Sequence, residues 1–328
     1  MVAALCALYA GYGLFLASRM VWTDGEMGLL PAGYGQLRQR YQASWGVPLP
    51  VGPARLSYRL PGAYWLYAWA PHVPRDCQLA LGRAFSLALS LPGVAATLIW
   101  AGELGGPFAT LAAGIMLLSS ATLVGTYATA SYEGVVASLW MVGLYAAWHG
   151  APTAAVACGA AVAGLRHTAY WQAWALWLAA GTDLAGAVAI GSLVVLFCGA
   201  PASFWTVFWW GTPPPGLPRD GWVKGGRVLA QRYEPFAGWL ALALVSHAWT
   251  PVTARLAAVT LGLLVVQHGQ RAWWRPKWVV GYLPDFALPV VLILAVAIAP
   301  ALGKVDWWPY VLLWLGWGLW RRRHPALP

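Results

Sequence analysis

The sequence predicts an all-α integral membrane protein, and three observations support this fold class. The 328 residues are 60% hydrophobic and only 9% charged, whereas an ordinary soluble domain is about 25% charged. Long apolar runs are separated by short polar breaks, which is the pattern of several membrane-spanning helices. The runs are continuous stretches of Ala, Leu and Val without polar alternation, which gives no support to a transmembrane β-barrel.

The first predicted element is a membrane helix over residues 2–20, which we expect to be retained because no basic segment precedes it. A long first external loop follows over residues 21–78, and prolines and glycines interrupt it repeatedly. Residues 29–41 predict a short interfacial helix. The aromatic stretch at residues 62–70 is expected to dip into the membrane interface.

Further spans follow this loop, and a second polar loop at residues 207–234 divides them. Together with the first helix they give about 11 spans in one membrane domain over residues 1–328. The remaining expected spans lie at 81–102, 107–127, 133–149, 153–169, 170–182, 185–206, 235–250, 254–269, 279–300 and 306–320.

The formal net charge is +10, and arginines and lysines gather in a few loops. Such clusters suit anionic lipid headgroups or phosphates, although loops of membrane proteins are often basic. If the first loop is external, alternation makes the basic loops at 207–234 and 270–278 external too, against the positive-inside tendency. This indicates either an anionic substrate outside the cell or a different span count. We expect no nucleic-acid partner.

Tryptophan is abundant, with 24 residues in the chain. Clusters of tryptophan near predicted helix ends are typical of the aromatic belt at a membrane interface. A few aromatic residues near the first long loop would alternatively stack on the face of a sugar ring.

Carboxylates are scarce, since the chain has only ten. Asp24 and Glu26 lie in VWTDGEMGLLPAGYGQL, directly after the first helix, and their side chains can converge on a non-helical loop around Gly25. One would then act as a general base while the other binds a metal or a hydroxyl; otherwise they are an ordinary solvated pair. Glu133 opens a later span, where it either complements the helix dipole or faces the same cavity as Asp24.

Of three other charged residues, Arg166 has two possible roles, and Asp76 and Glu103 are expected to be solvated. Arg166 lies just inside an apolar run, where it either binds an anionic partner such as phosphate or extends from a helix end to the interface. Asp76 is expected in a polar loop beside Arg75, and Glu103 in a short solvated turn on the opposite side of the membrane.

The order of these motifs resembles the GT-C class of membrane glycosyltransferases that use polyprenyl-phosphate sugars, such as protein O-mannosyltransferases and aminoarabinose transferases. The similar segments are the acidic loop, RLPGAYWLYAWAP, LGRAFSLALS, ASYEGVVASLW, GLRHTAYWQAWAL and RPKWVVGYLPDFALPVVLIL. In this comparison Asp24 matches the acidic motif and Arg83 the arginine of the second span, and the late motif is matched by Lys277, Tyr282 and Pro284. The acidic motif here reads Asp-Gly-Glu where relatives have Asp-Glu.

The resemblance implies a GT-C-type helical bundle that catalyses an inverting transfer from a polyprenyl-phosphate-linked sugar donor to a lipid, glycan or protein acceptor. Asp24 would be the catalytic base and Glu26 a second catalytic carboxylate, and Glu26 and Glu133 would orient the acceptor or hold a divalent metal. Asp24 and Glu133 would hold a divalent cation, Mg or Mn, if one is required. The donor phosphate would be bound by Arg59, Arg166, Lys277 and Tyr282.

The resemblance also implies a location in the bacterial inner (plasma) membrane, in contact with membrane lipids, with the active site on the periplasmic, external side. The alternative is a non-catalytic, Trp-rich scaffold subunit of a larger membrane complex. A transporter is a weaker alternative, because charges in the middle of the predicted spans are scarce.

Overall fold

The computed structural model describes residues 1–20, 26, 30, 66–119, 121–165, 170–181, 186, 190, 239, 249–255, 257–258, 292–293 and 295–300. Within these residues the fold is helical and contains no strand. The helices are α1 (Val2–Arg19), the 3-10 turn η2 (Ala70–His72), α5 (Arg75–Ser119), α6 (Ala121–Tyr127), α7 (Glu133–Trp148), α8 (Pro152–Leu165) and α9 (Tyr170–Ala179).

Two of these helices, α1 and α5, are long and apolar enough to cross a membrane. Helices α7 and α8 are apolar but shorter. The all-α fold is therefore confirmed for the described residues. The spans predicted after residue 185 lie largely outside them, so the total of about 11 stays a prediction.

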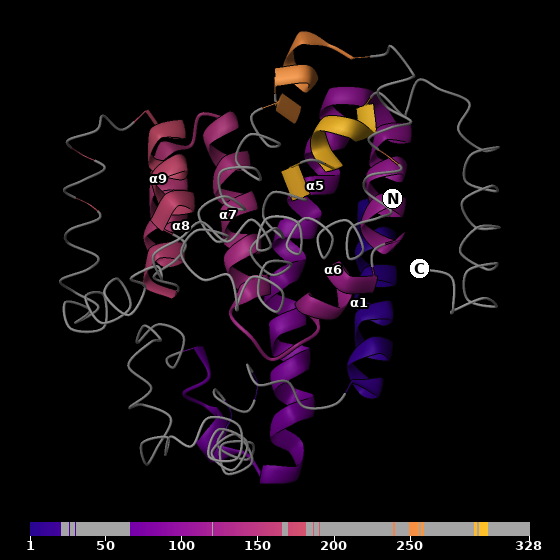
Figure 1. Cartoon of the computed structure of the whole chain (residues 1–328), viewed down its shortest axis with the longest axis vertical. Coiled ribbons are helices and arrows are strands. Elements are labelled where there is room, and N and C mark those ends of the chain that lie inside the picture. Colours follow the sequence, from indigo (N-terminus) through magenta and orange to yellow (C-terminus); the bar gives the residue numbers. More distant parts are fainter. Residues whose placement is uncertain are drawn as a thin grey trace, which may run out of the picture.

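Helix α1 packs against α5 and α6 through one residue in four. Its buried positions are Leu5, Tyr9, Gly13 and Ala17, which form a single stripe along the helix. Gly13 allows close approach, because a Cβ there would lie 2.8 Å from a methyl group of Leu87. Figure 1 shows α1 on one side of α5, with α7, α8 and α9 on the other.

Helix α5 changes direction at Gly106, where φ is 78° and ψ is −170°. Residues with a Cβ rarely adopt this conformation, so a glycine is required at the bend. Pro107 follows at once and fits the start of a new helical segment, where its missing N–H has no helical partner to lose. The break coincides with the boundary predicted between the spans at 81–102 and 107–127.

Helices α5 and α7 run parallel, and their contacts repeat every seven residues. Ser86 donates a hydrogen bond to the carbonyl of Ser131 at 3.3 Å, and the Gly93 amide donates to Ser138 Oγ at 2.9 Å. One further repeat along, the rings of Trp100 and Tyr145 lie 6.2 Å apart. Seven residues are close to two helical turns, so the same faces stay in contact along the pair.

The next helices alternate in direction. Helix α8 returns along α7, where a Cβ at Gly143 would lie 2.9 Å from that of Cys158. Helix α9 then runs parallel to α7, and the indole of Trp140 donates to the carbonyl of Gln172 at 2.9 Å. The end of α8 and the start of α9 therefore lie at the same end of the bundle as the start of α7.

Two sequence predictions near α5 need correction. The first loop was expected to extend to residue 78, but α5 begins at Arg75. Asp76 therefore lies in the first helical turn, where a carboxylate is favoured by the helix dipole. Glu103 lies within α5, three residues before the bend, where the sequence predicts a turn. Its carboxylate accepts from Tyr145 Oη at 2.7 Å and is 2.9 Å from His149 Nε2.

Candidate functional site

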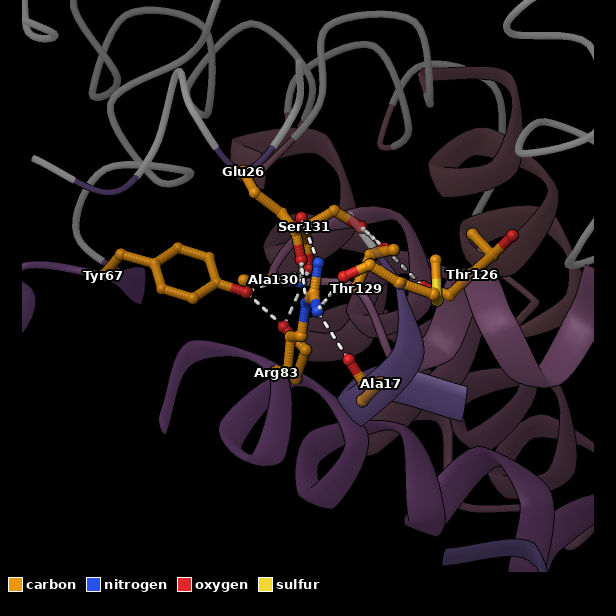
Figure 2. Close-up of polar contacts among 10 residues, drawn as sticks. Ala17, Glu26, Tyr67, Arg83, Thr126, Thr129, Ala130 and Ser131 are labelled. Atoms are coloured by element: carbon orange, nitrogen blue, oxygen red, sulfur yellow. Dashed lines mark hydrogen bonds and ion pairs between the residues drawn. The ribbon is translucent and has the colours of Figure 1, made fainter. Parts of the chain in front are cut away.

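The candidate site is centred on a buried ion pair between Glu26 and Arg83, shown in Figure 2. Arg83 donates from Nε to Glu26 Oε1 at 2.7 Å and from Nη2 to Oε2 at 2.9 Å. The side chains are 0% exposed for Glu26 and 5% exposed for Arg83. Two parallel hydrogen bonds match the planar guanidinium to the carboxylate, which is the strongest geometry for this pair.

Arg83 also closes the end of α1. Its Nη1 donates to the carbonyls of Ala17, at 2.5 Å, and Met20, at 2.9 Å. The last carbonyls of a helix have no partner within the helix, and Met20 is extended, so α1 cannot supply one. One side chain from the third turn of α5 therefore joins the end of α1 to the segment containing Glu26.

Glu26 is also bonded to the turn that precedes α7. The amide of Ala130 donates to Glu26 Oε1 at 3.0 Å. The amide of Leu30 donates to the Glu26 carbonyl at 2.8 Å. Gly82 permits this approach, since a Cβ there would lie 3.0 Å from that of Ala130 and 3.2 Å from Leu30 Cδ1. Glu26 thus connects segments far apart in the sequence.

A set of hydroxyl groups lies beside the ion pair. Tyr67 Oη is hydrogen-bonded to Ser86 Oγ and donates to the carbonyl of Ser131 at 3.2 Å. Thr129 Oγ1 donates to the carbonyl of Thr126 at 2.7 Å and lies 3.2 Å from Ser131 Oγ. These bonds fix residues 128–132, the turn that leads into α7, as Figure 2 shows.

Glu133 is the first residue of α7, as predicted, and is only 9% exposed. It follows Ala130 by three residues, so the structure brings Glu133 to the same end of the bundle as Glu26. A carboxylate in the first turn is stabilised by the positive end of the helix dipole.

The remaining predicted site residues lie outside the described residues. They are Asp24, Arg59, Arg166, Lys277 and Tyr282. The helices flanking Arg166 are described, and they end at Leu165 and begin at Tyr170, at the Glu133 end of the bundle. The predicted interfacial helix at 29–41 and the loop at 207–234 are also outside the description, apart from Leu30.

The resemblance implies that Asp24 and Glu133 would hold a divalent cation if one is required. In the part of the chain that the structure describes, no group of three or more His, Cys, Asp or Glu side chains is arranged to hold a metal ion. Glu133 is the one predicted ligand within that part.

The sequence reasoning missed the partner of Glu26. Arg83 lies inside a long apolar helix, and a charged group in that position requires an anionic partner. The same rule that was applied to Arg166 would have predicted a carboxylate for Arg83. However, this rule does not identify which of the ten carboxylates of the chain is the partner of Arg83. The hydroxyls of Tyr67, Ser86 and Ser131 gave no signal, because isolated polar residues in apolar runs are common.

Comparison with known proteins adds no assignment to this geometry. No protein-family model matches the chain, and neither a curated protein nor a solved structure is significantly similar to it.

Proposed function

We propose that the chain is an inverting membrane glycosyltransferase that takes a sugar from a polyprenyl-phosphate donor, with Asp24 as the general base. The single observation that carries the proposal is the anchoring of Glu26 between the end of α1, the start of α5 and the turn before α7. The motif order of the sequence, which resembles the GT-C class, supplies the chemistry.

Asp24 precedes Glu26 by two residues in the sequence, and we propose that its carboxylate acts at the same end of the bundle. Both oxygens of Glu26 are engaged by Arg83, and one of them also by Ala130. In the proposal Glu26 is therefore a positioning residue, and Asp24 is the carboxylate that acts on the acceptor.

The proposed reaction proceeds in one displacement. Asp24 takes the proton of the acceptor hydroxyl while the acceptor oxygen attacks the anomeric carbon of the sugar. The bond from this carbon to the phosphate oxygen breaks, and polyprenyl phosphate leaves with the bonding electrons. A positioned general base contributes about 100- to 10,000-fold. Arg59, Arg166, Lys277 and Tyr282 are proposed to stabilise the leaving phosphate, and Glu133 to orient the acceptor.

The proposed setting follows from the same chemistry. Because a polyprenyl donor is anchored in the membrane, the protein is proposed to be embedded in the plasma membrane. The long first loop with Asp24 is proposed to face the external side. The full GT-C-type bundle of about 11 spans would place the basic loops at 207–234 and 270–278 around the phosphate.

The proposal is tested by turnover of labelled polyprenyl-phosphate hexoses by the purified full chain in lipid nanodiscs, with a cell-envelope extract as acceptor. Asp24→Asn should lower turnover at least about 100-fold, because the amide cannot accept the proton. The matched control is Asp76→Asn, whose exposed carboxylate in the first turn of α5 should leave turnover within about twofold. Unchanged turnover in Asp24→Asn removes the base, and no turnover with any donor favours the scaffold alternative.

A further inference from the structure

Three aromatic rings gather beside the buried ion pair. Tyr67 and Phe85 have centroids 6.0 Å apart at an interplanar angle of 74°, and Trp69 and Phe85 are 5.6 Å apart at 71°. Tyr67 is buried, whereas Trp69 and Phe85 are half-buried. Because Trp69 and Phe85 are only half-buried, part of their surface stays exposed at this end of the bundle.

The indole nitrogen of Trp69 is buried and finds no hydrogen-bond acceptor in the structure as described. Buried indole N–H groups are normally bonded, because an unmade hydrogen bond leaves the donor desolvated without compensation. A rotation of the half-buried Trp69 side chain would let this donor bond an acceptor oxygen that a ligand brings.

The same cluster borders the hydroxyl groups of the candidate site. Tyr67 supplies a ring to the cluster and bonds through its hydroxyl to Ser86 and Ser131. Ala130, the residue before Ser131, donates to Glu26. Leu30, Tyr67 and Ala130 belong to one buried apolar cluster, and Trp69 and Phe85 pack against this cluster. One compact unit therefore carries apolar faces and hydrogen-bonding groups side by side.

We propose that Trp69 and Phe85, supported by Tyr67, form a platform that binds a pyranose ring. The C–H groups of one sugar face carry partial positive charge and pack against the negative face of an aromatic ring. The ring hydroxyls supply the acceptor that the Trp69 N–H lacks. This inference rests on the proposed function, where the ring belongs either to the donor sugar or to a glycan acceptor, and it specifies which residues hold that ring.

The experiment measures sugar binding directly, without turnover. Saturation-transfer NMR on the full chain in nanodiscs would use methyl α-mannopyranoside and methyl α-glucopyranoside as probes. Trp69→Ala and Phe85→Leu should weaken binding about fivefold or more, and Trp69→Phe, which keeps a ring but loses the N–H, should give a smaller loss. The control is Trp148→Ala, a 48% exposed residue at the far end of α7, which should bind as the parent does.

Melting temperatures of the same variants separate the platform from a membrane anchor. If Trp69→Ala and Phe85→Leu lower the melting temperature but bind both glycosides like the parent chain, the rings are interfacial anchors and the proposal is wrong. No saturation transfer to either glycoside in the parent chain also overturns it.

Turnover kinetics then assign the ring to a source. A raised KM for the lipid-linked donor places the donor sugar on the platform, and a raised KM for the acceptor places a glycan there. Sugar binding without turnover would contradict the transferase proposal and support the platform. Turnover that does not change in the Trp69 and Phe85 variants would support the transferase proposal and contradict the platform.

Discussion

Arg83 and Glu26 are 57 positions apart in the sequence and form a two-pronged ion pair with N–O distances of 2.7 and 2.9 Å. The guanidinium is also shared with two carbonyls at the end of α1. Because both side chains are removed from water, each depends on the other for its charge to be tolerated. The pair therefore links the first loop to the helical bundle, and its removal should have a large effect.

Replacing Arg83 with methionine should destabilise the protein strongly. The substitution leaves Glu26 buried without its counter-charge and the carbonyls of Ala17 and Met20 without their donor, a loss of about 3–5 kcal/mol. The measurement is thermal or denaturant unfolding in nanodiscs. The exposed pair of Glu103 and His149 is the control, and His149→Gln there should cost no more than about 1 kcal/mol.

The double variant tests whether the interaction is a true pair. Combining Arg83→Met with Glu26→Gln removes both charges, so it should be more stable than the sum of the two single losses predicts, by about 1–3 kcal/mol. Additive losses would show that the two side chains stabilise the fold independently.

The parallel packing of α5 and α7 should depend on Gly93 and Ser138. A Cβ at residue 93 would lie 2.5 Å from the Cα of Ser138, so Gly93→Ala should cost about 1–3 kcal/mol through overpacking. Gly11→Ala in α1 is the matched control, because nothing lies within 4 Å of its Cβ position. Helix propensity should make the control variant more stable by up to about 1 kcal/mol. Equal effects in the two variants would contradict the packing described.

The hydrogen bond across the same contact can be tested separately. Ser138→Ala removes the hydroxyl that accepts from the Gly93 amide and should cost about 0.5–1.5 kcal/mol, the usual net contribution of one hydrogen bond. Ser138→Thr retains the hydroxyl and serves to separate the bond from the shape of the side chain. Hydrogen exchange at the Gly93 amide should be faster in the alanine variant than in the parent chain.

The bend of α5 should require glycine at residue 106. Its φ of 78° and ψ of −170° are strained for any residue with a Cβ, although the space around it is open. Gly106→Ala should therefore cost about 1–3 kcal/mol through backbone strain alone. A variant as stable as the parent chain in unfolding experiments would show that α5 continues straight through this position.

Several helices were predicted closely from local sequence. The start of α7 at Glu133 and the break in α5 at Gly106 follow from an acid in the first turn and from a Gly-Gly-Pro sequence in an apolar run. Each of these patterns depends on only a few neighbouring residues, so local sequence rules are sufficient to predict the helix boundaries. The start of α5 was placed too late because the charged pair Arg75–Asp76 resembles a loop when its helical context is unknown.

The candidate site was only partly predictable, because it depends on contacts between distant segments. Glu26 and Glu133 were singled out as scarce carboxylates, and the structure brings both to one end of the bundle. The pairing of Glu26 with Arg83 and the bond from Ala130 depend on how three helices pack. No local pattern specifies that packing.

The most direct test of the account is a side-by-side measurement of turnover in Asp24→Asn and Glu26→Gln, each normalised to the folded fraction and compared with its melting temperature. The account predicts that Asp24→Asn keeps the parent's melting temperature and loses at least about 100-fold in turnover. It predicts that Glu26→Gln acts mainly on stability and lowers the melting temperature, because Arg83 loses its buried counter-charge. The opposite division, with a stable but inactive Glu26→Gln and an active Asp24→Asn, would contradict the account.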